Sequence, residues 1–556
     1  MDANRQSFIL FVSLASLALF LFRAGAMPLT DPDEGRYALI ARQMATSGDC
    51  LIPQLFGLPY LEKPPLLYWL TSTMFRLFGA TELPARIGPA LAAAFGVLAA
   101  GCFGRTFSPT AGVLAAAVLA LCGLYFVLAR ILVTDMLFSV TLAVALFAFF
   151  QHREALAPSR RWAVTFWTSL ALATLSKGPV AVVIAALVIA VDAFLDRSAR
   201  SLLDRRLVAS SPIFLAIALP WFAFVQARYP SFLWFYVWRE HLERAAGREH
   251  VESFFWYVPW VLGGSMPWTP LAVFAAPFWW RLSRQASLEG RAARFLLVWT
   301  VTVFALFSTS RSKLATYILP VFPPLAVLLA IFLDHGLRGE IPRERLQRAW
   351  AATALTFALG AIALVASVFA FPAVDLVARA LIALPLLAGG AAIFRTRGST
   401  QRLRPLVATV LAAVALYGVS ACVAPHLASS FTAKPLIDRL AADIRPGDAS
   451  AVWGKYLPSA AFYLSPPPWL IGTRPELRYG RSLAGDSPNI AADLEDLARR
   501  TEGQRLYVLT DDRSKRKREL RKALGDVELV ASNYMGALWL RSPVPSLQPF
   551  TQGSSK

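Results

Sequence analysis

Three lysines stand out among the residues of this sequence that could do chemistry. The first 433 residues contain only Lys63, Lys177 and Lys313, against several dozen arginines. Each lysine borders a hydrophobic stretch, in Leu-Glu-Lys-Pro-Pro, Leu-Ser-Lys-Gly-Pro and Ser-Lys-Leu-Ala-Thr-Tyr. An ammonium is a compact point charge that suits a phosphate. If all three lysines lie on one side of a membrane, they mark a site for an anionic substrate.

A cluster of carboxylates follows the first hydrophobic stretch, in Thr30-Asp31-Pro32-Asp33-Glu34-Gly35-Arg36-Tyr37. Three carboxylates within four positions repel one another unless cations offset them, which implies a partner. The chemistry could be metal coordination, general-base action or the holding of a cationic or hydroxylated substrate. The same residues would also begin a helix over 33–46, since acidic groups complement its dipole there. Both interpretations can hold together.

Two further motifs place single charged groups beside predicted spans. In Tyr60-Leu61-Glu62-Lys63-Pro64-Pro65 the prolines fix the backbone, so Glu62 and Lys63 point different ways. Lys63 suits a phosphate and Glu62 a metal ion or a sugar hydroxyl; a solvated charge pair is the alternative. In Arg130-Ile131-Leu132-Val133-Thr134-Asp135 the isolated aspartate could serve a reaction centre or cap a helix.

The stretch 226–253 is aromatic and mixed in charge, and it contains His241. His241 could be a metal ligand or an acid or base, although Glu62 and one histidine form a thin ligand set. A surface histidine is the alternative. The sequence contains no HExxH, Walker, GxSxG or CxxC motif, which disfavours proteolysis, ATP-driven transport and redox chemistry. The four cysteines provide no disulfide framework, and Cys50 has no obvious partner.

Composition indicates an integral membrane protein. Of the 556 residues 56% are hydrophobic, and apolar runs of 16 to 24 residues recur between residues 7 and 424. The formal charge of +20 is typical of arginine in cytoplasmic loops, and no basic-aromatic module indicates nucleic-acid binding. The N-terminal apolar segment resembles a signal peptide, but we interpret it as a retained anchor because more spans follow.

Arginine-rich connectors predict the topology. By the positive-inside rule the connectors are cytoplasmic, and the spans between them come in pairs. The connectors cover 152–161, 196–206, 281–294, 334–348 and 395–404. The expected spans cover 7–23, 86–104, 110–128, 135–151, 162–175, 178–195, 207–225, 256–280, 295–309, 314–333, 349–371, 375–394 and 405–424.

The apolar segment 65–79 decides the parity. It begins with prolines, contains Arg76 and is short, so we expect an interfacial helix and about thirteen crossings. Fourteen crossings would put the C-terminal region inside and break the arginine pattern. With thirteen, all three lysines are external, together with the carboxylate cluster and Asp135. Polar groups at such depth are costly and indicate function.

The C-terminal region 429–543 is expected to form a small α/β unit. Strand-like runs cover 449–453, 505–509 and 527–531, and helix-like runs cover 490–500 and 513–523. The basic run 515–518 could touch anionic lipid headgroups or simply be solvated. Residues 544–556 are expected to be a disordered tail.

Seven stretches resemble one family in order. They are DPDEGRYALIARQM (31–44), GLPYLEKPPLLYW (57–69), ARILVTDM (129–136), LSKGP (175–179), PWFAFVQ with REHLERAAG (220–247), MPWTP (266–270) and SKLATYILPVFPPLA (312–326). The chain thereby resembles the GT-C polytopic glycosyltransferases of the protein-mannosyltransferase-like superfamily, most closely the undecaprenyl-phosphate 4-amino-4-deoxy-L-arabinose:lipid A transferases. The resemblance implies an all-α polytopic membrane domain over 1–428, with periplasmic loops 27–84 and 226–255, and a periplasmic α/β domain over 429–543.

The resemblance also implies a reaction and its residues. A sugar would pass, with inversion, from undecaprenyl phosphate to a lipid A phosphate on the periplasmic side of the inner membrane, which contributes to polymyxin resistance. Asp33 and Asp135 would be the catalytic acids, and Glu62 with His241 would hold one divalent metal ion. The donor-phosphate contacts would be Arg36, Lys63 and Lys177. The substrate cavity would include Asp31, Glu34, Tyr37, Tyr60, Lys313 and Tyr317.

Physical chemistry supports part of this assignment. The leaving group is a phosphate, so cations are needed where negative charge develops. A phosphate acceptor is already ionised, so Asp33 would orient the acceptor or a sugar amine, whereas a hydroxyl acceptor would require a base. A relative that uses another polyprenyl-phosphate sugar, or a protein or glycan acceptor, is the alternative enzyme. A polyprenyl-lipid flippase is the alternative of another class, and it would place polar residues at both ends of the spans.

Overall fold

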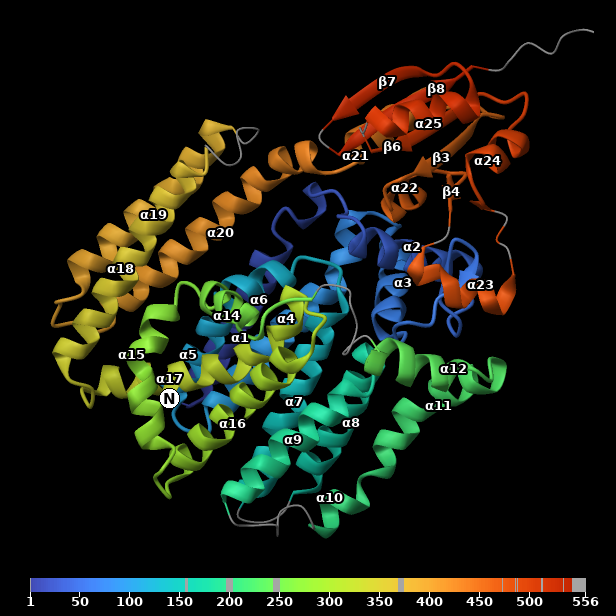
Figure 1. The fold of residues 1–556 in the computed structure, drawn as a ribbon. Coiled ribbons are helices and arrows are strands. Elements are labelled where there is room, and N and C mark those ends of the chain that lie inside the picture. Colours follow the sequence, from blue (N-terminus) through green and yellow to red (C-terminus); the bar gives the residue numbers. More distant parts are fainter. Residues whose placement is uncertain are drawn as a thin grey trace, which may run out of the picture. The chain divides into compact units, whose positions relative to one another are not determined.

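The computed structural model describes residues 2–155, 159–196, 204–243, 251–368, 375–472, 474–485, 487, 489–511, 514–533 and 535–542, with backbone only at 2–6, 241–242, 429–431 and 514–515. The chain forms two compact units, each described here by itself (Figure 1). The helical unit contains Met1–Met27, Asp49–Leu51 and Leu61–Ala424. The mixed unit contains Pro28–Gly48, Ile52–Tyr60 and Pro425–Lys556.

The helical unit consists of apolar helices that follow the expected spans. Its helices are α1 (Asp2–Leu21), α3 (Leu66–Phe78), α4 (Glu82–Gly104), α5 (Pro109–Ala120), α6 (Gly123–Leu128), α7 (Thr134–Glu154), α8 (Arg160–Lys177), α9 (Val180–Leu195), α10 (Arg205–Ala209), α11 (Pro212–Arg228), α12 (Phe232–Trp234), η3 (Phe235–Glu243), η4 (Phe254–Trp256), α14 (Tyr257–Gly264), α15 (Thr269–Leu282), α16 (Leu288–Thr309), η5 (Ala315–Val321), α17 (Phe322–Arg338), α18 (Arg343–Ala366), α19 (Leu376–Thr396) and most of α20 (Arg404–Phe431).

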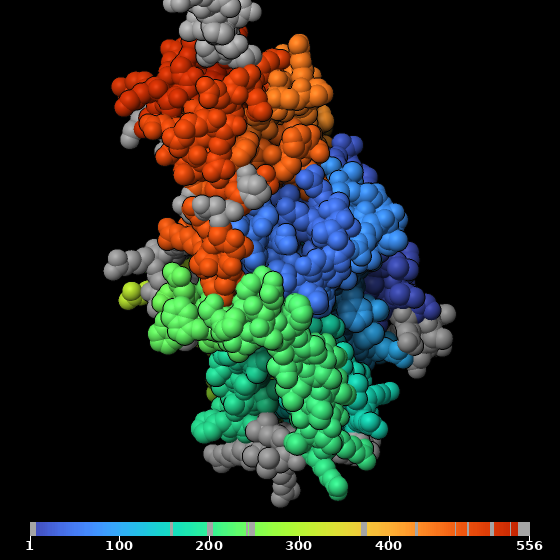
Figure 2. All heavy atoms as spheres, turned by 90° about the vertical axis from the view of Figure 1, so that its right-hand side faces the viewer, coloured from blue at the N-terminus to red at the C-terminus, as the bar shows by residue number. Residues whose placement is uncertain are grey.

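Many of these helices are built to cross a bilayer. Within the described residues, nine helical segments are long and apolar enough to do so. Helix α11 shows the pattern clearly, since Leu215 and Leu219 are half exposed and its green segment lies at the surface in Figure 2. The protein is therefore a multi-pass membrane protein. The count of thirteen crossings stays a prediction. Helix α3 confirms that residues 66–78 form a short helix.

Two expected spans are each divided into two helices. The span expected over 110–128 is interrupted after α5 because the Gly123 amide donates to the Met266 carbonyl, at 2.9 Å, instead of within the helix. The span expected over 256–280 is interrupted between α14 and α15, where Pro267 has no amide hydrogen to donate. Tyr417 of α20 bonds to the Leu121 carbonyl at 2.8 Å, so α20 supports the interruption after α5.

The helix ends predicted to be cytoplasmic are joined by ion pairs. Asp192, at the end of α9, is fully buried and pairs with Arg153 of α7 and with Arg294 of α16. Arg291 of α16 pairs with Glu154 of α7 at 2.7 Å. Arg294 also pairs with Asp196, the first residue of connector 196–206, at 2.6 Å. The pairs therefore place the connectors 152–161, 196–206 and 281–294 at one end of the helical unit, as the arginine pattern requires.

The mixed unit contains a six-stranded sheet in the order β5-β4-β3-β6-β8-β7. Strands β5, β4, β3 and β6 run parallel to one another, whereas β8 pairs antiparallel with both β6 and β7. The strands are β3 (Ala449–Trp453), β4 (Trp469–Ile471), β5 (Ile490–Ala491), β6 (Leu506–Thr510), β7 (Glu528–Asn533) and β8 (Gly536–Arg541). The helices are α21 (Lys434–Asp443), α22 (Pro458–Tyr463), η6 (Pro475–Leu477), α23 (Arg478–Ala484), α24 (Leu494–Arg500) and α25 (Ser514–Leu524).

The expected α/β character of this region is confirmed. Alternate side chains of β3 and β6 enter two apolar clusters on the two faces of the sheet, because successive strand residues point to opposite faces. One expectation was partly wrong, since residues 490–491 form β5 and the expected helix begins only at Leu494. Asp493 explains the later start, because its side chain caps this helix by accepting from the Asp496 amide.

Two segments near the N-terminus belong to the mixed unit. They are α2 (Asp33–Ser47) and the hairpin of β1 (Gln54–Leu55) and β2 (Leu58–Pro59). Helix α2 packs on α22, and the hairpin packs on α23. Gly480 allows the second contact, because a Cβ there would lie 2.2 Å from the Pro59 carbonyl oxygen. The carboxylate cluster at the start of α2 therefore belongs to the same compact unit as the C-terminal part of the chain.

Replacing Asp192 should destabilise the helical unit. Asp192→Asn keeps the side-chain shape but leaves two arginines beside a neutral amide, and loss of one partner from a buried ion pair costs about 3 kcal/mol. The free energy of unfolding in mixed micelles measures this change. Glu344→Gln is the matched control, because its pair with Arg348 is exposed and contributes roughly 0.5 kcal/mol or less. Equal losses in the two variants would contradict the structural role of Asp192.

Candidate functional site

Asp31 is held by the C-terminal chain. Both of its carboxylate oxygens accept hydrogen bonds from Ser459 of α22, one from the amide at 2.9 Å and one from the hydroxyl. Gly35 allows this approach, because a Cβ there would lie 2.5 Å from the Ser459 amide nitrogen. Further along the chain, Arg42 of α2 donates to the Ala461 carbonyl of the same helix α22 at 2.8 Å. The segment 31–42 is therefore fixed on α22 at two points along its length.

The environment of Asp31 changes its acidity. Burial raises the pKa of Asp31 from 3.8 to about 7, and the nearby charge of Glu34 adds to the rise, whereas the two hydrogen bonds from Ser459 lower it. Asp31 thus titrates near neutral pH.

Arg36 lies among carboxylates and aromatic rings within the mixed unit. Its guanidinium pairs with Asp33 one turn earlier and with Glu476 of η6 at 3.5 Å. The guanidinium carbon also lies 5.2 Å from the centre of the Tyr37 ring and 5.8 Å from that of Tyr60. The side chain is 10% exposed, and its Nε has no hydrogen-bond partner among the described residues. Arg36 is therefore a buried cation whose Nε–H can still donate a hydrogen bond.

The other carboxylates of the cluster differ in exposure. Glu34 is fully buried and accepts bonds from the Thr30 amide at 3.0 Å and the Thr30 hydroxyl at 2.9 Å, so it shapes the turn before α2. The Asp33 side chain is 46% exposed, and Asp33 is the first residue of α2, where the sequence predicts that a helix begins. Of the three, Asp33 is the carboxylate most open to a ligand.

Asp135, Lys177 and Tyr317 come together in the helical unit. Asp135 lies in the first turn of α7, and Lys177 is the last residue of α8. The two form a buried ion pair, and the ammonium lies 3.9 Å from the centre of the Tyr317 ring. A cation and an anion at such depth, held against a phenol, can bind an anionic and a cationic or hydroxyl group side by side.

Lys63 has a carboxylate partner that the sequence did not indicate. Its ammonium lies 3.6 Å from Glu240 of η3, and both side chains are mostly buried. Glu62 is also buried. The side chain of His241 lies outside the described residues, which contain no group of three or more histidine, cysteine, aspartate or glutamate residues fit for a metal ion. The metal site therefore stays a prediction, which metal analysis of the purified protein would test.

Lys313 differs from the other two lysines. Its ammonium is buried and donates to the carbonyls of Glu252, at 2.9 Å, and of Ser310. The same two chain segments meet in a bridge between Val251 and Ser312. These contacts explain Lys313 as the residue that ties the two segments together, and its place in a substrate cavity stays a prediction.

Sequence reasoning missed three residues that complete these groups. Ser459 and Glu476 lie more than 400 positions from the motif they contact, so no local pattern could have indicated them. Glu240 lies in the aromatic stretch of mixed charge at 226–253, but no pattern in the sequence pairs Glu240 with Lys63.

Ser459→Ala should shift the pH dependence of stability. The pKa of Asp31 is higher in the folded than in the unfolded protein, so its contribution to stability is complete below about pH 4 and is lost as the pH rises through about 7. Removing the hydroxyl raises this pKa further, so the loss should move to higher pH by roughly one unit. Thermal unfolding between pH 5 and 9 measures the shift. Ser482→Ala, an exposed serine of α23, is the control, and identical profiles for both variants would contradict the link.

Comparison with known proteins points to one group. Residues 62–224 match the family model described as dolichyl-phosphate-mannose-protein mannosyltransferase. The chain is 32% identical over 60% of its length to the undecaprenyl phosphate-alpha-4-amino-4-deoxy-L-arabinose arabinosyl transferase of Aeromonas salmonicida (strain A449), and 31% identical over 60% to that of Erwinia tasmaniensis. The alignments span 61% and 59% of those relatives.

The fold is shared over nearly the whole chain. The crystal structure of ArnT from Cupriavidus metallidurans bound to undecaprenyl phosphate superposes with a TM-score of 0.80 at 24% identity, covering 96% of this chain and 98% of that one. The apo structure of the same protein gives a TM-score of 0.78. The resemblance seen in the sequence is therefore confirmed: this multi-pass chain has the polytopic GT-C fold and is similar to the protein-mannosyltransferase-like and aminoarabinose transferase families.

Proposed function

We propose that the chain is an inner-membrane glycosyltransferase that moves 4-amino-4-deoxy-L-arabinose from undecaprenyl phosphate to a lipid A phosphate, with its active site facing the periplasm. The names of its relatives support the donor and the sugar. The observation that carries the proposal is that Arg36, Lys63 and Lys177 are each largely buried and each lie beside a carboxylate. Such cations, kept out of water, can hold a lipid-linked phosphate.

The proposed reaction exchanges one phosphate ester for another. An oxygen of the acceptor phosphate forms a bond to the anomeric carbon, while the bond from that carbon to the undecaprenyl phosphate oxygen breaks. Negative charge grows on the departing phosphate, where a preorganised cation stabilises the transition state. Lys63 and Lys177 are suited to this task because a short-range ammonium charge is strong in a site of low dielectric.

The carboxylates orient the substrates in this proposal. An ionised phosphate needs no base, so Asp33 and Asp135 would hold the sugar ammonium or a sugar hydroxyl against the phosphate. Both carboxylates already contact cations, Asp33 with Arg36 and Asp135 with Lys177. The pair of buried Asp135 with Lys177 thus offers both signs of charge to a substrate that itself carries both.

The alternatives differ in substrate or in class. Another polyprenyl-phosphate sugar, or a protein or glycan acceptor, would use the same cations. A polyprenyl-lipid flippase would need unpaired polar groups along a path through the helical unit. At the end predicted to be cytoplasmic the buried Asp192 is already paired with two arginines, which favours a structural function there over a transport path.

Loss of the gene should abolish the addition of aminoarabinose to lipid A. Mass spectra of lipid A from strains with and without the gene, grown where the donor is made, measure this, and polymyxin sensitivity should rise in the mutant. Unchanged lipid A would contradict the sugar and the acceptor but not the use of a polyprenyl-phosphate donor. Re-expression of the intact gene is the control.

Lys63→Ala should lower transfer about 10²–10³-fold, because it removes a cation from the departing phosphate. Asp33→Ala should cost less, roughly tenfold to a hundredfold, since it orients a substrate that is already ionised. Transfer by purified protein with undecaprenyl-phosphate sugar measures both, and Lys63→Arg should restore part of the rate. Lys522→Ala, an exposed lysine of α25, is the control. Unchanged turnover in both variants would disprove the site.

A further inference from the structure

A groove runs between α19 and α20 at the end of the helical unit predicted to be cytoplasmic. It encloses about 600 Å³ and is lined by residues 385–396 of α19 and residues 401–415 of the chain that enters α20. The walls are mainly alanine and leucine side chains, including Ala388, Ala392 and Ala408. The lining runs from Arg404 to Ala415, which is about 16 Å along a helix. This length suits much of one lipid acyl chain.

The connector 395–404 beside the groove is strongly basic, and one of its arginines, Arg404, lines the groove. The connector between the two helices carries four arginines and no acidic residue, at positions 395, 397, 402 and 404. Among the described residues, none of these four guanidiniums forms an ion pair with a carboxylate. Arg402 donates to the Gly336 carbonyl at 2.7 Å, and Arg404, which lines the groove, donates to Gln401 at 2.8 Å. Both partners are neutral, so the charge of the connector is uncompensated.

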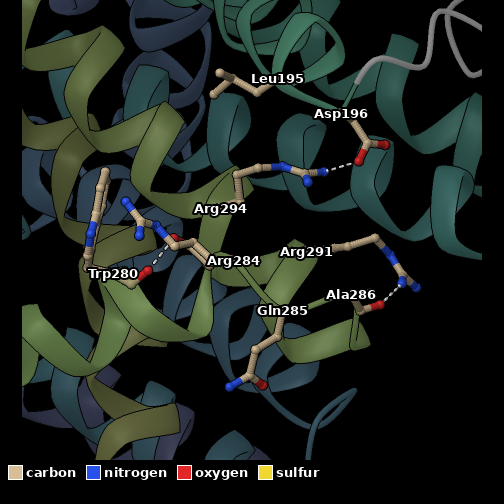
Figure 3. Close-up of a pocket in the computed structure, with 9 residues that line it drawn as sticks. Leu195, Asp196, Trp280, Arg284, Gln285, Ala286, Arg291 and Arg294 are labelled. Carbon is tan, nitrogen blue, oxygen red and sulfur yellow. Dashed lines mark hydrogen bonds and ion pairs between the residues drawn. The ribbon is translucent and has the colours of Figure 1, made fainter.

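A second cavity at the same end also contains arginines, but two of them are paired with carboxylates. It encloses about 560 Å³ between the ends of α9 and α15 and the start of α16 (Figure 3). Arg294 there pairs with Asp196 at 2.6 Å, and Arg291 pairs with Glu154 at 2.7 Å. The third arginine, Arg284, lies 4.6 Å from the centre of the Trp280 ring and has no carboxylate partner among the described residues. Two of the three arginines are thus already used in ion pairs, whereas no described arginine of the connector 395–404 is, which favours the groove between α19 and α20 as the place for an outside anion.

We propose that the groove between α19 and α20 binds an anionic phospholipid, with one acyl chain along the alanine-lined walls and its phosphate at Arg404. The occupant must be both apolar over some 16 Å and anionic at one end, which describes a lipid. An apolar helix of a second copy would cover the walls but would supply no anion at Arg404. Basic pockets between membrane helices are known to hold anionic headgroups, each arginine contributing about 1 kcal/mol. The site is independent of the transferase chemistry.

The experiment compares lipids that differ only in the headgroup. Full-length protein in detergent is titrated with dioleoyl phosphatidylglycerol, dioleoyl phosphatidylcholine or inorganic phosphate, and lipid binding is followed by native mass spectrometry and by thermal unfolding. Phosphatidylglycerol should bind and raise the unfolding midpoint more than the other two. Arg404→Gln should weaken this binding about fivefold. Arg348→Gln, which removes the same charge from an exposed residue of α18, should not.

A second pair of variants tests the walls. Ala408→Leu fills the groove without changing charge and should abolish the preference for phosphatidylglycerol, whereas Ala380→Leu, on an exposed position of α19 outside the groove, should keep it. Equal protection by both lipids, equal protection by phosphate alone, or unchanged binding in Arg404→Gln would overturn the proposal. So would a dimer in the native mass spectra that Ala408→Leu dissociates, because the groove would then belong to a second copy.

Discussion

The buried ion pair between Asp135 and Lys177 is the interaction on which the helical unit depends. Each charge sits at the helix end whose dipole favours it: Asp135 in the first turn of α7, and Lys177 at the last residue of α8. A buried ion left without its partner is costly. The pair therefore fixes the register of these two extensively packed helices and at the same time places both charges where a ligand can meet them.

Polar contacts also help to hold the mixed unit together, here between α2 and α22. Helix α2 carries the carboxylate cluster and buries apolar side chains such as Leu39 and Ile40. Polar contacts to α22 add to this packing: Ser459 on Asp31, and the carbonyls of α22 on Arg42. These contacts bring residues from the two ends of the chain into one compact unit. A domain boundary drawn only along the sequence, at residue 428, does not express this, because the N-terminal motif completes the C-terminal fold.

How far the sequence could predict the molecule depends on the range of each interaction. Hydropathy and arginine bias are local, and they located the apolar helices and the connectors whose ion pairs meet at Asp192. Propensity is also local, and β3 lies where it was expected. The break after α5 was not predictable, because it depends on a bond from Gly123 to the distant Met266. The partners of Lys63 and Asp31 were missed for the same reason.

The choice between lysine and arginine follows from what each charge must do. The proposed phosphate ligands Lys63 and Lys177 each face one carboxylate, so an entering phosphate has to take the place of that carboxylate. An ammonium can exchange such partners because its donors are not confined to one plane, whereas a planar guanidinium favours a bidentate contact with one carboxylate. Arginine instead fills positions with permanent partners, such as Arg294 between Asp192 and Asp196. Lys63 and Lys177 are thus suited to exchange partners, whereas Arg294 holds helices together and the third lysine, Lys313, ties two segments together through carbonyl groups.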